Sequence, residues 1–66
     1  MDPKPSLGRV VHLNAGNGIF HTATIAKVWS DECVNLGCLD ENGTPYNKTS
    51  VLRGGDVGNW NWPTRV

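Results

Sequence analysis

Short turn segments rich in glycine and asparagine divide this chain into runs too short for anything but strands. Residues 14–18 and 40–43 combine Asn or Asp with Gly, the pairing that tight β-hairpin turns require. Residues 53–58 contain three further glycines. The runs between these turns are rich in β-branched and aromatic residues and show no helical period. The sequence therefore predicts an all-β fold.

The expected architecture is a small five-stranded barrel of the SH3-like, partly open kind. Pro45 lies near the start of the fourth strand and suggests that this strand forms an edge of the sheet, because proline cannot donate to a ladder. Residues 1–6 are expected to form an extended leader, and residues 7–66 a single barrel domain. The five strands are predicted at residues 8–14, 19–29, 32–39, 44–52 and 59–62.

Length and charge narrow the classes of function. A domain of 66 residues buries only about 60% of its unfolded surface, so chains of this size often add a disulfide, a metal or a partner subunit. The chain has six Lys and Arg against six Asp and Glu, so it lacks the basic block that sequence-independent nucleic-acid binding needs. No apolar run reaches membrane-spanning length, and the polar start is unlike a signal peptide. We expect a cytoplasmic protein.

The two cysteines are predicted to be free. Cys33 and Cys38 lie five residues apart in one expected strand, which puts their side chains on opposite faces. The strand would also hold them roughly 16 Å apart, well beyond bridging distance. Both are interpreted as small hydrophobic side chains.

Neither the histidines nor the carboxylates form a recognisable catalytic or metal site. If the first hairpin closes through Gly16 and Asn17, His12 faces His21. If it closes one residue later, His21 faces Asn14 instead. Two imidazoles without a third or fourth ligand do not make a zinc site, and no carboxylate pair has the apolar setting of an acid–base pair. The sequence predicts no enzyme activity, no metal and no cofactor.

The closely spaced tryptophans near the C-terminal end are the strongest candidate for function. In an extended strand Trp60 and Trp62 share one face and Asn61 points the other way. That aromatic face either covers the core or packs against a second subunit, or it forms a stacking surface for flat heterocycles. Burying an unpaired Asn61 amide would cost roughly 1–3 kcal/mol, so we expect Trp60 to be buried and Trp62 to be more accessible. Trp29 is predicted to be a core residue.

Several segments of the chain resemble one family of proteins. These are residues 5–12, residues 28–36 (VWSDECVNL), residues 49–51 and residues 58–66 (GNWNWPTRV). The resemblance is to small uncharacterised accessory proteins encoded in tailed bacteriophages and prophages. This chain departs from the family pattern in a short first hairpin and at Gly37-Cys38, where bulkier residues are usual. The resemblance implies a phage accessory protein made in the cytoplasm of the bacterial host.

Together these features lead to three functional hypotheses. The first is a binding protein that sequesters a small nucleotide-like molecule, such as a host-defence signal, with Arg9, Arg53 and Arg65 contacting phosphate. The second is a protein-binding adaptor or structural accessory of the phage particle that uses the same aromatic patch. The third, a nucleic-acid module, is weakened by the zero net charge. A homodimer is expected, and the candidate ligand-binding residues are Trp60, Trp62, Asn61, Arg53, Arg9, His12 and His21.

Overall fold

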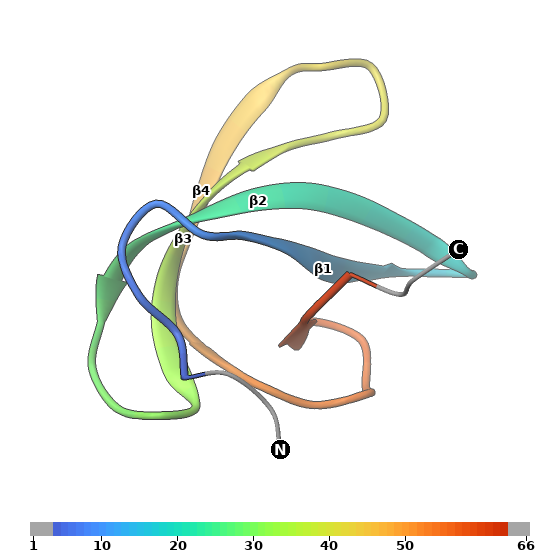
Figure 1. Ribbon diagram of the computed structural model, residues 1–66. Helices are drawn as coiled ribbons and strands as arrows, with labels where there is room; N and C mark the ends of the chain where they lie inside the picture. Colours follow the sequence, from blue (N-terminus) through green and yellow to red (C-terminus); the bar gives the residue numbers. More distant parts are fainter. Residues whose placement is uncertain (1–3, 64–66) are drawn as a thin grey trace.

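All regular structure in the described part of the chain is β. The computed structural model describes residues 4–63, and within them every element is a strand (Figure 1). Each strand lies within two residues of its predicted bounds at either end, so the all-β prediction is confirmed. The strands are β1 Val10–Gly16, β2 Ile19–Val28, β3 Cys33–Leu39, β4 Pro45–Leu52 and β5 Trp60–Asn61.

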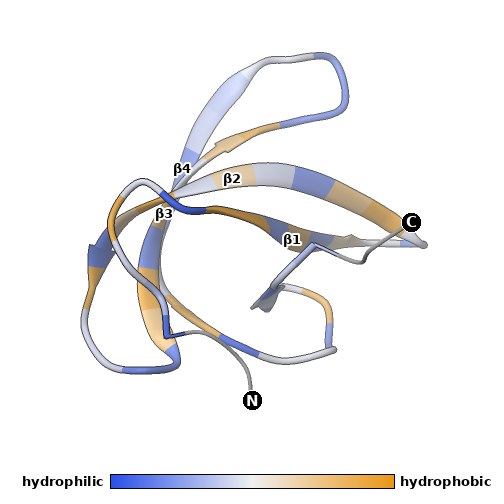
Figure 2. Ribbon diagram, viewed as in Figure 1, coloured by the Kyte–Doolittle hydropathy of each residue, from blue (hydrophilic) through white to orange (hydrophobic). Residues whose placement is uncertain are grey.

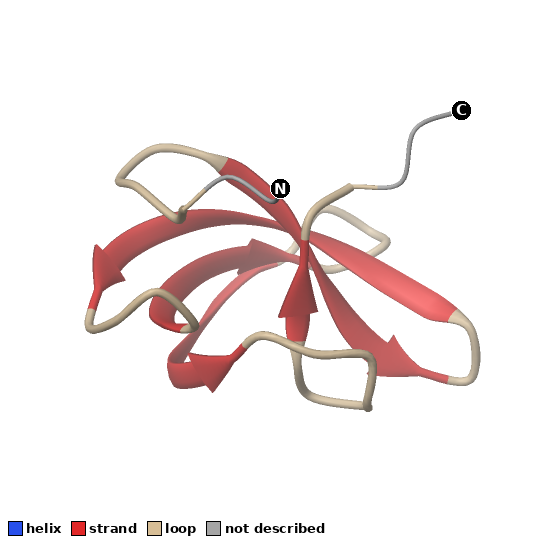
Figure 3. Ribbon diagram, turned by 60° about the horizontal axis from the view of Figure 1, so that its bottom comes forward, coloured by secondary structure: helices blue, strands red, loops and turns tan. Residues whose placement is uncertain are grey.

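The strands form one antiparallel sheet in the order β4-β3-β2-β1-β5, which fans out in Figure 3. β4 is an edge strand, as Pro45 predicted. The two edges of the sheet, β4 and β5, are joined in the described residues by one parallel bridge, between Arg53 just after β4 and Trp60 of β5. The sheet is therefore not closed into a barrel, and the SH3-like closure expected from the sequence is not shown.

One face of the sheet carries the core. Buried side chains alternate with exposed or half-buried ones along β1 and β3, and polar and apolar residues interleave along the strands (Figure 2). This period of two is what a sheet with a single buried face requires. No polar or charged side chain of the described residues is buried. The buried core consists of Val11, Leu13, Ala23, Ile25, Val34, Leu36, Cys38, Val51 and Trp60.

A bulge in β2 explains why Trp29 is not in the core. Ile25 pairs with Leu36 and Lys27 pairs with Asn35, so Ala26 is an extra residue between them. An extra residue moves every later side chain to the opposite face. Trp29 therefore leaves the face of Ile25 and is 56% exposed, and the prediction that it is a core residue is wrong.

The exposed Trp29 ring is held in place by its neighbours. The Lys27 Nζ lies 4.0 Å from the centre of the Trp29 ring. The Trp29 Nε1 donates a 2.9 Å hydrogen bond to the Asn35 Oδ1. The same oxygen accepts a 2.8 Å hydrogen bond from the backbone N–H of Ser50, which sits at a bulge in β4 with φ of 53°. Asn35 thus links the ring to the one strained residue of β4.

Replacing Asn35 with alanine is expected to destabilise the fold modestly. The change leaves the Ser50 N–H and the Trp29 Nε1 without their acceptor, and we expect a loss of about 0.5–1.5 kcal/mol because water can reach both groups. Urea unfolding of Asn35→Ala beside Asn47→Ala, an exposed asparagine of the same sheet, measures the difference. Equal midpoints for the two variants would contradict this role of Asn35.

The register of the first hairpin differs from both predicted alternatives. The turn is at Asn17 and Gly18, with φ of 54° and 74°, as the second alternative requires. A bulge between Asn14 and Gly16 then shifts the rest of the hairpin by one residue. His12 consequently pairs with Thr22, and Leu13 pairs with His21. The two histidines lie on opposite faces of the sheet, and neither predicted pairing occurs.

Cys38 is buried and Cys33 half-buried, and both are free thiols. Pro5 is buried, so the leader predicted for residues 1–6 contacts the domain at that point. Residues 1–3 of that leader, and the candidate phosphate ligand Arg65, lie outside the described residues. Among residues 4–63 no helix is long and apolar enough to cross a bilayer.

Candidate functional site

A hollow of about 240 Å³ lies on the outer face of the sheet, where β1 and β5 meet the loop of residues 53–59. Its polar lining consists of His12, Asn14, Asn59 and Asn61. Phe20 and Trp62 supply its aromatic residues, and Gly54 and Gly55 complete it. We call this feature the hollow.

Strand register brings the hollow's side chains together. His12 pairs with Asn61 of β5, and Asn14 pairs with Phe20 of β2. Residues that pair across antiparallel strands project to the same face. Because Val11 and Leu13 of β1 point into the core, their neighbours His12 and Asn14 point to the outer face, and their partners do the same.

The loop of residues 53–59 forms the other wall and is fastened to β1 through Asn14. The Gly58 N–H donates to the Asn14 carbonyl at 2.8 Å, and the Asn14 N–H donates to the Asn59 carbonyl at 3.0 Å. The Asn14 Nδ2 donates to the Gly55 carbonyl at 3.3 Å. A Cβ placed on Gly54 would lie only 2.5 Å from the Asn59 Nδ2. Glycine at position 54 therefore leaves the space that the Asn59 amide occupies.

The two tryptophans take the places that the sequence predicted for them. Trp60 is fully buried, and its Nε1 donates a 2.9 Å hydrogen bond to the Glu32 carbonyl. Trp62 is half-buried and lines the hollow. The two rings meet nearly at right angles, with centres 5.4 Å apart and an angle of 86° between their planes. Asn61 is exposed, as expected when Trp60 faces inward. Trp62 follows the end of β5, and its side chain packs against the core and also borders the hollow.

The two described candidate arginines lie beside the tryptophans and do not line the hollow. The Arg9 guanidinium carbon is 5.3 Å from the centre of the Trp62 ring. The corresponding carbon of Arg53 is 6.0 Å from the centre of the Trp60 ring. The Arg53 Nε also donates to the Asn61 Oδ1 at 3.2 Å. Both distances are within the range of cation–π contacts.

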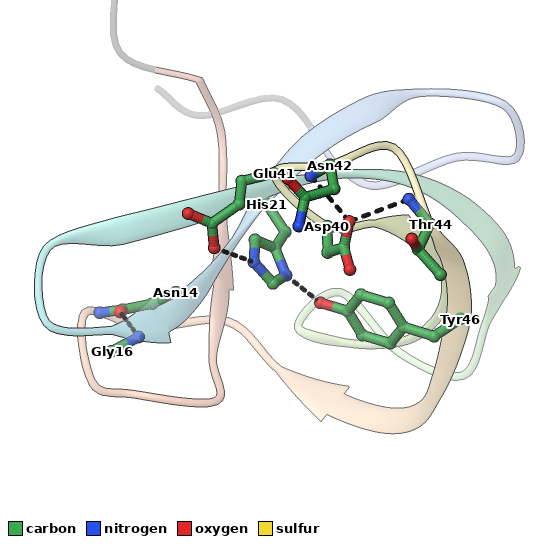
Figure 4. A network of polar contacts seen from close by, with 8 residues as sticks. All are labelled: Asn14, Gly16, His21, Asp40, Glu41, Asn42, Thr44 and Tyr46. Carbon is green, nitrogen blue, oxygen red and sulfur yellow. Dashed lines mark hydrogen bonds and ion pairs between the residues drawn. The ribbon is translucent and has the colours of Figure 1, made fainter.

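His21 belongs to a different polar cluster, on the core side of the sheet (Figure 4). Its Nδ1 is hydrogen-bonded to the hydroxyl of Tyr46, and its Nε2 lies 3.9 Å from a carboxylate oxygen of Glu41. Burial, and then the neighbouring Cys38, raise the pKa of Tyr46. Burial likewise raises the pKa of the Cys38 thiol. These groups fasten the β3–β4 hairpin to β2 and lie apart from the hollow.

Asp40 gives this cluster a dependence on pH. Hydrogen bonds from the backbone N–H groups of Thr44 (2.9 Å) and Asn42 (2.8 Å) to its Oδ1 lower the pKa of Asp40 from its usual value. A carboxyl whose pKa is lower in the folded state stabilises the fold above its unfolded pKa, and that stability is lost as the pH falls through the folded pKa.

We therefore expect Asp40→Asn to flatten the acid limb of the stability curve. The amide keeps an acceptor oxygen for the turn but cannot be protonated in this range. Urea midpoints measured from neutral pH to below about pH 4, the unperturbed range of aspartate, should fall less steeply for the variant than for the original chain. Parallel curves would show that the Asp40 hydrogen bonds do not distinguish its two protonation states.

Sequence reasoning identified part of the hollow. Of the candidate residues, the structure brings His12, Asn61 and Trp62 to it, places Trp60 beneath it, and leaves His21 on the other face. Asn59 and the glycine-rich segment of residues 53–58 directly precede Trp60 in the sequence. Sequence reasoning missed Asn14, which shares the face of His12 by alternation along β1, and Phe20, which joins only through the bulge that fixes the first hairpin's register.

No group of three or more His, Cys, Asp or Glu side chains in residues 4–63 is arranged to hold a metal ion. Comparison of the chain with protein-family models, curated proteins and solved structures finds no match. The resemblance to phage accessory proteins therefore stays a prediction.

Proposed function

We propose that this chain is a non-catalytic binding protein whose hollow takes a small nucleotide-like ligand. The observation that supports this proposal is the lining itself. Three asparagines and a histidine, together with Phe20 and Trp62, line one hollow with a volume of about 240 Å³. Concave sites with aromatic residues and a few convergent polar groups are typical of small-molecule binding.

Polar groups in the hollow are available for a ligand. Within the described residues, the side-chain amide of Asn59 and the Nδ2 of Asn61 make no hydrogen bond, and neither does the His12 ring. An amide offers both a donor and an acceptor, which suits the edge of a heterocycle. Phe20 is 57% exposed and pairs with Asn14 at the rim, so its ring can stack on a flat ligand.

A thermal-shift screen tests the proposal. The panel contains nucleosides, nucleotides and cyclic dinucleotides, because a ligand that binds only the native state raises its melting temperature. At a ligand concentration of about one hundred times Kd the native state gains about 2.7 kcal/mol, which is a shift of several degrees for a domain of this size. A panel without any shift at millimolar ligand would contradict the proposal.

The proposal extends to architecture and setting. We infer a partly open barrel of the SH3-like kind, a view supported by the Arg53–Trp60 bridge that returns the end of β4 to β5. The resemblance to phage accessory proteins supports a phage protein that acts in the cytoplasm of the bacterial host. In that setting, sequestering a nucleotide-like defence signal is the role we favour over the nucleic-acid module.

A second candidate function is a protein-binding adaptor or structural accessory of the phage particle. Its support is the number of large apolar side chains on the surface, among them Leu7 and Val57, each 69% exposed, and the pinned ring of Trp29. Exposed aromatic side chains such as Trp29 are frequent anchors of contacts between proteins.

We expect the chain to be a homodimer that covers some of these exposed apolar side chains. Light scattering at micromolar concentration should give twice the mass of one 7.2 kDa chain. A single-chain mass across the concentration range would contradict the dimer but not the proposed hollow.

A further inference from the structure

The lining of the hollow differs in charge from what a phosphate site requires. Among its described residues there is no Lys, Arg, Asp or Glu, and His12 is its single titratable side chain. Phosphate sites are built from arginine, lysine, metal ions or clustered backbone N–H groups. The hollow offers asparagine amides and aromatic residues in their place.

The nearest described arginines lie outside the hollow. Arg9 lies over Trp62, and Arg53 lies over Trp60 with its Nε bonded to Asn61. Among the described residues, a charged group buried in the hollow would therefore find no cation on the lining wall, and an unpaired buried charge is costly.

The size of the hollow also favours an uncharged ring over a complete nucleotide. Sites that enclose a whole drug-sized ligand have volumes of roughly 300–1,000 Å³, whereas the hollow has about 240 Å³. It suits the flat ring of a nucleotide better than the complete molecule. Asn59, held against Gly54, and Asn61 can each hydrogen-bond to the edge of such a ring.

We propose that the hollow binds the uncharged heterocycle of a nucleoside and leaves the sugar and any phosphate outside. This inference rests on the proposed function and restricts it, because it assigns the affinity to ring recognition and not to the arginines. Ring recognition through amides and stacking is insensitive to salt, whereas phosphate contacts weaken as salt rises.

The first experiment compares nucleosides with their phosphates on the complete chain. Equilibrium dialysis with adenosine, guanosine, cytidine and uridine, and with their 5′-monophosphates, is carried out at about 50 mM and about 200 mM salt, a range over which phosphate contacts lose affinity steeply. We expect the best nucleoside to bind within about tenfold of its monophosphate at both salts, because one charge-assisted hydrogen bond is worth roughly tenfold or more.

The outcomes separate the inference from the function on which it rests. A monophosphate that binds while its nucleoside does not would overturn the inference and leave nucleotide binding intact. If neither class binds, both the proposed function and the inference fail. Binding of the nucleoside that falls steeply with salt would also overturn the inference.

A second experiment tests the wall that places Asn59. Gly54→Ala adds a methyl group 2.5 Å from the Asn59 Nδ2 and must displace that amide, whereas a Cβ on Gly37, in β3 away from the hollow, meets nothing within 4 Å. We expect nucleoside affinity to fall about tenfold or more in Gly54→Ala, because the displaced Asn59 amide can no longer hydrogen-bond to the ligand. Gly37→Ala should bind as the original chain does.

Asn59→Ala removes the amide without adding bulk and serves if Gly54→Ala does not fold. Its melting temperature without ligand should stay close to that of the original chain, because the side chain makes no hydrogen bond among the described residues. Unchanged nucleoside affinity in folded Asn59→Ala or Gly54→Ala would overturn the inference.

Discussion

Replacing Trp60 with alanine is expected to remove about 3–5 kcal/mol from the free energy of unfolding, the range for deleting a buried aromatic side chain. Trp60 is the largest fully buried side chain, and its Nε1 hydrogen-bonds to the Glu32 carbonyl across 28 residues of sequence. The total free energy of unfolding of a domain of this length is only a few kcal/mol. Urea unfolding should show Trp60→Ala largely unfolded in dilute buffer.

Two companion variants make this result specific. Trp62→Ala should cost less, because its ring is only half-buried. Trp60→Phe keeps most of the apolar volume and removes one of the two hydrogen bonds that the Glu32 carbonyl accepts, since the Arg53 N–H still donates to it at 2.9 Å. We expect the lost hydrogen bond to cost about 0.5–1.5 kcal/mol. A greater loss of stability in Trp62→Ala than in Trp60→Ala would show that the roles of the two rings are reversed.

Phe20→Ala is expected to abolish most ligand binding while leaving the fold intact. The side chain is 57% exposed and is not part of the core. Stacking of a base on an aromatic ring is worth about 1–3 kcal/mol, or roughly 5- to 150-fold in affinity. Equilibrium dialysis with the nucleoside that gives the largest thermal shift measures the loss.

Trp29→Ala is the matched control for Phe20→Ala. Trp29 is 56% exposed, close to the value for Phe20, but follows the far end of β2 and does not line the hollow. It should bind ligand as the original chain does. Equal losses of affinity in the two variants would indicate a general effect of removing exposed rings, and not a site at the hollow.

The strands could be predicted from the sequence because the turns fix their ends. Asn-Gly and Gly-rich segments separate β-branched runs, and proline marks the edge strand at Pro45. The burial of Trp60, the exposure of Asn61 and the partial burial of Trp62 could also be predicted, from alternation and from the cost of burying an unpaired amide.

What could not be predicted depends on three bulges, in β1, β2 and β4. Each adds one residue, and one residue exchanges the two faces of everything that follows. Nothing in the local composition around Ala26 marks the shift that exposes Trp29. The same effect at Asn14 separates His12 from His21 and brings Phe20 to the rim of the hollow. Predicting which side chains form a site on β-strands therefore requires the strand register, because the register decides which residues share a face.

The contact between Trp60 and Trp62 has an optical consequence. Two indoles with centres 5.4 Å apart, at a fixed angle of 86°, are close enough for their electronic transitions to couple. Circular dichroism in the far ultraviolet should then contain a paired positive and negative band that comes from these rings and not from the backbone. Since one ring fills the core and the other lines the hollow, this signal reports on both in the same spectrum, without any added label.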